Sequence, residues 1–217
     1  MQVRFVLPLI AFAGLAACSS NGSGSAENAA NVATMNEQQR AQAEHRAPDP
    51  DKVMSERWQA LFGQPDKLVA ALNDMGYKVP GYAAGTSGYT ATGQQVLPAD
   101  EKNPPATVKT NVVASGTADT VQTITFTFDT HVSGSPDQRR VRDILGFPRQ
   151  IVNGVLQRFE VGPGDPVVSA LTLFHSAKAS SHGATITVDA TPGNGDRFAD
   201  QHIVVTISRA GDAASAA

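Results

Sequence analysis

The feature that most restricts the fold of this chain is an alternation of large apolar and small polar side chains near its middle. Within Asp119–Thr130, the apolar set is Ile124, Phe126 and Phe128, and the polar set is Thr123, Thr125, Thr127 and Asp129. Successive side chains of a β-strand point to opposite faces, so this spacing gives one apolar and one polar face. It predicts a strand in a sheet that is covered on one side and wet on the other.

Three further stretches alternate in the same way. Thr107–Ser115 precedes the first strand, and Gly116–Ala118 between them is short enough for a hairpin turn. Near the C-terminus, residues 184–189 and 203–208 alternate again and are joined by a Gly- and Asp-rich loop, Thr191–Asp200. These patterns predict two β-hairpins.

Helical spacing occurs before and between the two hairpins. Apolar residues at 52–62 and 68–75 predict a helical hairpin, which Gly63 and Pro65 interrupt. A second helical stretch begins at Ser135 and is expected to end at Gly146, with Pro148 as the first residue of the next helix. After Gly162-Pro163-Gly164, the sequence from Asp165 suits a helix that Asp165-Pro166 would cap, although a strand there stays open.

Runs of helices and runs of strands without strict βαβ alternation are typical of the α+β class. We therefore expect one α+β domain over residues 51–209. Its antiparallel sheet has about four strands, is covered on one face by helices and is preceded by the helical hairpin. Gly76–Pro105 reads as long turns with one short strand at most.

The first 17 residues have the composition of an export leader. Arg4 precedes the apolar run Phe5–Gly14, which is half the roughly 20 residues that a helix needs to cross a bilayer. The run ends at Leu15-Ala16-Ala17-Cys18, and Cys18 is the only cysteine. These four residues resemble the lipobox of bacterial lipoproteins, which is a leucine, two small residues and the lipidated cysteine.

The resemblance implies cleavage before Cys18, diacylglyceryl transfer to its sulfur and acylation of the new amine, for example with palmitate. Several acyl chains on one residue give stable membrane anchoring. Ser19 stands where many inner-membrane lipoproteins carry aspartate, which favours a periplasm-facing position on the outer membrane. No other segment of the chain is apolar enough to predict a membrane span.

The segments that flank the predicted domain are poor in large apolar residues. Residues 18–50 are predicted to be a flexible tether, within which Glu27–Arg46 has the composition for a transient helix. Residues 210–217 are predicted to be a disordered tail. A net charge of −3 with few aromatic residues argues against nucleic acid as a partner. The densest basic group, Arg139, Arg140, Arg142 and Arg149, is interpreted as a solvated helix face.

Motifs for catalysis are not recognisable in the sequence. It contains no G-x-S-x-G, no S-x-x-K and no H-E-x-x-H, so we predict no catalytic residue, metal site or cofactor. The set His131, His175 and His182 is retained only as an alternative for a cell-wall enzyme. The oxygen-rich loop Asp189–Asp200 misses the spacing of a calcium-binding EF-hand and is interpreted as a long turn.

The candidate ligand surface is a group of three tyrosines that follow glycines. Tyr77, Tyr82 and Tyr89 would suit stacking on sugar rings, although such residues more often cover a core edge. The leading hypothesis is a non-enzymatic binding or assembly module that meets envelope proteins. The alternatives are a peptidoglycan- or carbohydrate-binding module or cell-wall enzyme, and a carrier of a small ligand between helices and sheet.

Overall fold

The strand predicted at residues 119–130 lies at the centre of a seven-stranded sheet in a computed structural model of the chain. The structure describes residues 34–98, 102, 104–134, 136–192 and 200–210. The chain divides into two units, Met1–Met35 and Asn36–Ala217, and the fold described below belongs to the second.

Neighbouring strands of this sheet are all antiparallel, and their order is β1-β2-β3-β4-β7-β6-β5. Their bounds are β1 Ala83–Gly85, β2 Gly88–Leu97, β3 Ala106–Gly116, β4 Val121–Val132, β5 Ala177–Ser181, β6 Ala184–Pro192 and β7 Asp200–Arg209. The four predicted strands correspond to β3, β4, β6 and β7, and the antiparallel α+β class is confirmed.

The prediction of about four strands was too low because the inner positions of β1, β2 and β5 are mostly small or polar. The middle of the inner side of β2 is formed by Ala91, Gly93 and Gln95, since residues 77–79 cover it closely. A Cβ on Gly93 would lie 2.6 Å from Cγ2 of Val79. In β5 the partly buried positions are Ala177 and Ala179. Small residues give no alternation of hydropathy.

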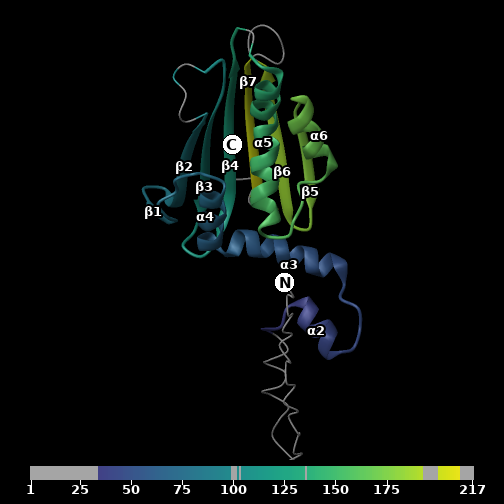
Figure 1. The fold of residues 1–217 in the computed structure, drawn as a ribbon. Coiled ribbons are helices and arrows are strands. Elements are labelled where there is room, and N and C mark those ends of the chain that lie inside the picture. Colours follow the sequence, from purple (N-terminus) through teal and green to yellow (C-terminus); the bar gives the residue numbers. More distant parts are fainter. Residues whose placement is uncertain (1–33, 99–101, 103, 135, 193–199, 211–217) are drawn as a thin grey trace, which may run out of the picture. The chain divides into compact units, whose positions relative to one another are not determined.

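Four helices follow the sequence from the end of the tether to β5: α3 Pro50–Gly63, α4 Pro65–Asp74, α5 Gln138–Gln157 and α6 Asp165–Leu173. The helical hairpin is confirmed as α3 and α4, and Asp165 begins a helix rather than a strand. Helices α5 and α6 lie side by side on one face of the sheet (Figure 1). No helix in the described part of the chain is long and apolar enough to cross a membrane.

The predicted break at Gly146 and Pro148 was wrong, because α5 continues through both residues. Glycine and proline cost roughly 1 and 3 kcal/mol in a helix interior. Burial on both sides of the break offsets this cost, since Ile144, Phe147, Ile151 and Val152 all face the core. Each fully buried side chain of this size contributes about 1.5–3 kcal/mol.

The folded unit begins at Asn36 rather than at Asp51, because part of the predicted tether packs against the domain. Helix α2, Glu37–Ala43, contacts α3 and buries Glu37 and Ala41. The Glu37 N–H donates to both carboxylate oxygens of Glu56, at 2.8 and 2.9 Å. Arg46 Nη1 donates to Glu37 Oε1 at 2.5 Å. The polar sequence is held by partly buried hydrogen bonds, which hydropathy does not reveal.

Candidate functional site

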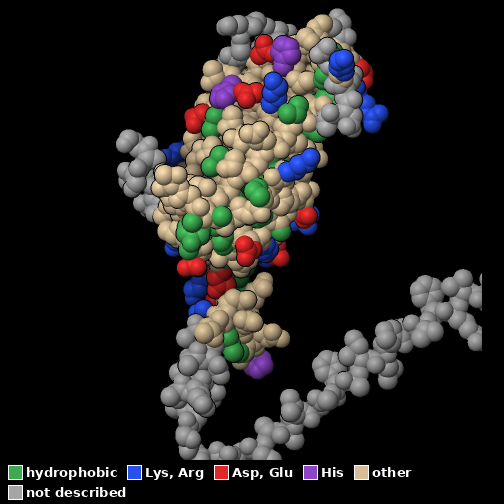
Figure 2. All heavy atoms as spheres, turned by 90° about the vertical axis from the view of Figure 1, so that its left-hand side faces the viewer, with side chains coloured by type: hydrophobic (Ala, Val, Ile, Leu, Met, Phe, Trp, Pro, Cys, Tyr) green, Lys and Arg blue, Asp and Glu red, His purple; other side chains and the backbone are tan. Residues whose placement is uncertain are grey.

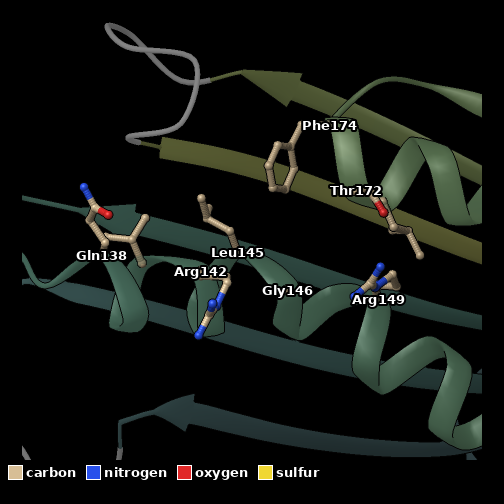
Figure 3. A pocket seen from close by; sticks show the side chains of 9 residues that line it. Gln138, Arg142, Leu145, Gly146, Arg149, Thr172 and Phe174 are labelled. Carbon is tan, nitrogen blue, oxygen red and sulfur yellow. The ribbon is translucent and has the colours of Figure 1, made fainter.

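A groove of about 470 Å³ lies between the first half of α5 and the end of α6 (Figure 3). Its volume is within the range of about 300–1,000 Å³ that is usual for small-molecule sites. The lining residues are Gln138, Val141, Arg142, Leu145, Gly146 and Arg149 from α5, and Leu171, Thr172 and Phe174 from α6 and its C-cap. Most of the lining is apolar.

The helix period explains how α5 presents this lining. Arg142, Leu145, Gly146 and Arg149 are spaced three, four and seven residues apart, so they form one stripe along the helix. Residues one step around from this stripe, such as Ile144 and Ile151, turn into the core. Leu171 is fully buried and forms the floor of the groove from the α6 side.

Two backbone features give the groove its space and its wall. A Cβ on Gly146 would meet no atom within 4 Å, so the glycine leaves open space beside α5. Phe174 ends α6 in the left-handed conformation, with φ 54° and ψ 55°. Glycine is the usual residue there, and a side chain costs free energy in this conformation. In Figure 3 the Phe174 ring faces Leu145 across the groove.

Among the described residues, the charged groups of the groove are both cations. Arg142 and Arg149 line it, and no described carboxylate does. The Nε of Arg142 is 4.0 Å from Oδ1 of Asp143, which is a weak and exposed contact. Arg149 has no hydrogen bond or ion pair with the residues that the structure describes. Two of the four arginines interpreted as a solvated helix face therefore border an apolar groove. Their seven-residue spacing was the sequence signal that places both on the same side of α5.

The three candidate tyrosines do not form one surface. Tyr77 is 1% exposed, and its hydroxyl lies 2.6 Å from Oγ1 of Thr110 in the core. Burial raises the pKa of Tyr77 to about 12. Tyr82 and Tyr89 are partly exposed, with ring centroids 5.9 Å apart. The prediction is therefore wrong for Tyr77, and only the other two can contact a ligand.

The alternative catalytic set is not brought together, because His131 and His182 lie at opposite ends of the sheet. Nδ1 of His131 is 2.5 Å from Asp200, and Nδ1 of His202 is 2.6 Å from Asp129, in two reciprocal pairs across β4 and β7. His182 lies at the other end of the sheet, since it follows β5 and precedes β6. No group of three metal-binding side chains occurs among the described residues. Residues 193–199 of the oxygen-rich loop are outside them.

His182 belongs to a short chain of hydrogen bonds with Ser181 and Asp51. The Ser181 hydroxyl is 2.6 Å from His182 Nδ1, and His182 Nε2 is 3.3 Å from Asp51 Oδ1. Nucleophile, base and acid stand in this order in serine hydrolases. Here Ser181 and His182 are neighbours in a turn, and the Asp51 side chain is 88% exposed, so water competes for the acid. The geometry suits a surface turn better than an activated serine.

The sheet face opposite the helices is rich in hydroxyl groups. One row in register crosses six strands: Thr90, Ser115, Thr123, Ser208, Thr185 and Ser180. The side of the molecule on which β2 and β3 lie shows mainly uncharged polar side chains and backbone, with histidines beside carboxylates near its upper end (Figure 2). Tyr89 is the neighbour of Thr90 in β2 and therefore points to the opposite, helix-covered face, where Tyr82 packs against the edge of the core.

Comparison of the chain with protein-family models, with curated proteins and with solved structures finds no match. The candidate site therefore rests on its own geometry. Cys18, the predicted lipidation site, lies outside the described residues.

Proposed function

We propose that this chain is a lipid-anchored, non-enzymatic binding module of the bacterial cell envelope, and that the groove between α5 and α6 is its binding site. The observation that carries the proposal is an apolar groove bordered by Arg149, a cation with no partner among the described residues. Ligand sites combine an apolar lining with a few polar groups that fix orientation. The lipobox at Leu15–Cys18 supports anchoring at a membrane that faces the periplasm, on the outer membrane for preference.

Within the folded unit, the groove lies away from α2 and α3, where the chain enters this unit. Helix α5 begins six residues after the end of β4, so the groove lies at that end of the sheet. Helix α3 lies toward the opposite end, where Trp58 lines a pocket with Ser181 and Ala184 of the β5–β6 turn. The chain leaves toward Cys18 from α2, which packs on α3. The groove and α3 therefore lie toward opposite ends of the sheet within the folded unit.

Anchoring is tested by replacing Cys18 with serine. We expect the Cys18→Ser chain to lose palmitate labelling while its circular dichroism spectrum stays that of the wild type, because the cysteine lies before the folded unit. Normal labelling of this variant would contradict anchoring through Cys18.

Binding is tested by placing a photoreactive side chain at Thr172, in the groove, and at Thr92, on the hydroxyl-rich face. We expect irradiated cells to give an adduct from position 172 that disappears when Gly146→Leu fills the groove. Adducts that are insensitive to Gly146→Leu, or that form only from position 92, would contradict the site. Ester hydrolysis that Ser181→Ala abolishes would contradict a non-enzymatic module.

Carbohydrate binding is the second candidate, and the contact between Tyr82 and Tyr89 favours it. Two adjoining and partly exposed rings offer an apolar surface on which a sugar ring can stack. Co-sedimentation with peptidoglycan that is lost in a Tyr82→Ala/Tyr89→Ala variant, and kept in Tyr77→Phe, would support it. Binding that is absent, or equal in both variants, would exclude this surface.

A further inference from the structure

We infer that the groove between α5 and α6 takes a single-chain anionic amphiphile of the fatty-acid class, with its carboxylate at Arg149 and its hydrocarbon chain along α5. This inference rests on the proposed function and names the ligand of the same site. Three observations carry it: the sign of the charge, the length of the lining and the size of the groove.

The charge of the lining selects an anion. Arg142 and Arg149 border the groove, and none of the described lining residues is a carboxylate. Arg149 is the better partner for an anion, because Arg142 lies 4.0 Å from Asp143. A guanidinium binds a carboxylate through two parallel hydrogen bonds. Thr172, which lies near Arg149 in Figure 3, already donates its hydroxyl proton to the Val168 carbonyl at 2.7 Å.

The lining away from Arg149 suits a hydrocarbon chain. Val141, Leu145, Leu171 and Phe174 supply apolar surface, and Gly146 leaves the space beside them open. From Arg149 to Gln138 the α5 lining covers twelve residues, and the eleven steps between them give a rise of about 16 Å. This length suits an extended chain of medium length that lies parallel to the helix axis.

The size of the groove favours a small amphiphile over a helix of a partner protein. At about 470 Å³ it falls within the range of small-molecule sites. A stable protein interface needs roughly 800 Å² of surface from each partner. Among the described residues beside the groove, Leu173 is the only large apolar side chain that is exposed, at 62%. The surface around the groove therefore offers little more apolar area to a partner.

The test measures binding of octanoate, decanoate and dodecanoate to the full-length chain carrying Cys18→Ser, by calorimetry below their micelle-forming concentrations. We expect affinity to rise two- to fourfold for each added methylene until the groove is filled. Decanol should bind more weakly than decanoate. Arg149→Gln should weaken decanoate about tenfold and leave decanol unchanged. Gly146→Leu should abolish binding of both.

Arg139→Gln is the matched control, because it removes an exposed arginine of α5 that does not line the groove. Equal weakening by Arg139→Gln and Arg149→Gln, equal affinity for decanol and decanoate, or binding that survives Gly146→Leu would each overturn the inference. If decanoate does not bind but the position-172 adduct still depends on Gly146, the ligand class is wrong and the binding module stands. If an acidic amphipathic peptide binds in the groove and decanoate does not, the ligand class is again wrong and the proposed binding site is kept.

Discussion

Tyr77 shows how one buried hydroxyl group ties two distant segments together. Its ring packs against Phe126 in the core, with centroids 6.2 Å apart, and its hydroxyl pairs with Thr110 of β3. Burial disfavours the phenolate, which raises the pKa of Tyr77 to about 12 from the usual value of about 10. Ionisation of this group is therefore coupled to unfolding.

We expect the stability of the protein to fall between about pH 10 and pH 12 in a way that Tyr77→Phe abolishes. The neutral phenol is favoured in the folded chain, so its contribution is complete below pH 10 and is lost as the pH rises toward 12. The measurement is the free energy of unfolding in urea at several pH values. Lysine titration affects both chains equally, so the difference between them reports Tyr77. Parallel pH profiles would contradict the prediction.

At pH 7 the same substitution should destabilise the protein by about 1 kcal/mol, because it leaves the Thr110 hydroxyl buried without its partner. Sequence could propose the tyrosines as a group but could not separate Tyr77 from Tyr82 and Tyr89. All three follow a glycine. Tyr77 is buried because it packs at Thr110 of β3 and Phe126 of β4, strands that begin more than 25 residues further along the chain than Tyr77. The other two tyrosines are partly exposed.

Helix α5 contains two glycines in different surroundings, and this pair tests how its packing works. A Cβ on Gly146 would meet open space, whereas a Cβ on Gly154 would lie 2.5 Å from the sulfur of Met75. Gly154 thus allows close approach to the residue that ends α4, while Gly146 only leaves the groove open.

Gly146→Ala should raise the free energy of unfolding by about 0.5–1 kcal/mol, since alanine is the better helix former and nothing obstructs its methyl group. Gly154→Ala has the same gain in propensity but must displace Met75, so its net effect should be smaller or destabilising. Urea denaturation of the two variants checks this. An equal gain in both would show that the contact with Met75 imposes no constraint.

Helix α2 should detach when the charge on Glu37 is removed. A hydrogen bond from the Arg46 guanidinium and another from the Asp49 N–H lower the pKa of Glu37 to about 2. The attachment is therefore complete above about pH 4.5 and weakens as the pH falls toward 2. Glu37→Gln should reproduce the loss at pH 7, as faster hydrogen exchange in α2 without a change in α5.

Gln38→Ala is the control for this variant, because Gln38 is exposed and next to Glu37. Unchanged exchange in Glu37→Gln would mean that α2 is held by Ala41 and the backbone contacts to Glu56 rather than by the carboxylate.

At the scale of elements, the sequence predicts those whose packing shows in their own hydropathy. The strong strand β4 and the hairpin of α3 and α4 are of this kind. The missed elements depend on distant partners. In β2, Gly93 leaves room for the Val79 side chain. Helix α5 continues through Pro148 because side chains before and after this residue are buried in the core. The groove could not be predicted, since it requires α5 to be continuous and α6 to lie beside it.

For the whole molecule, stability comes from the single covered face of the sheet. Phe126→Ala should lower the free energy of unfolding by about 3–5 kcal/mol, because Phe126 is fully buried. That is a large part of the 5–15 kcal/mol typical of a domain. Thr125 is next to Phe126 in the sequence but points to the opposite face of the sheet, so Thr125→Ala should cost less than about 1 kcal/mol. Similar losses in both variants, measured by chemical denaturation, would mean that the hydroxyl-rich face is also covered.

The attachment of α2 has a mechanical consequence for an anchored chain. If Cys18 is held in a membrane, tension from a bound partner enters the folded unit at Asn36 and reaches the contacts of Glu37 first. These few hydrogen bonds are loaded before any strand of the sheet. Their rupture would let the fourteen residues Asn36–Asp49 extend by a length on the order of 40 Å. Helix α2 would then unfold under tension before the sheet and its groove do.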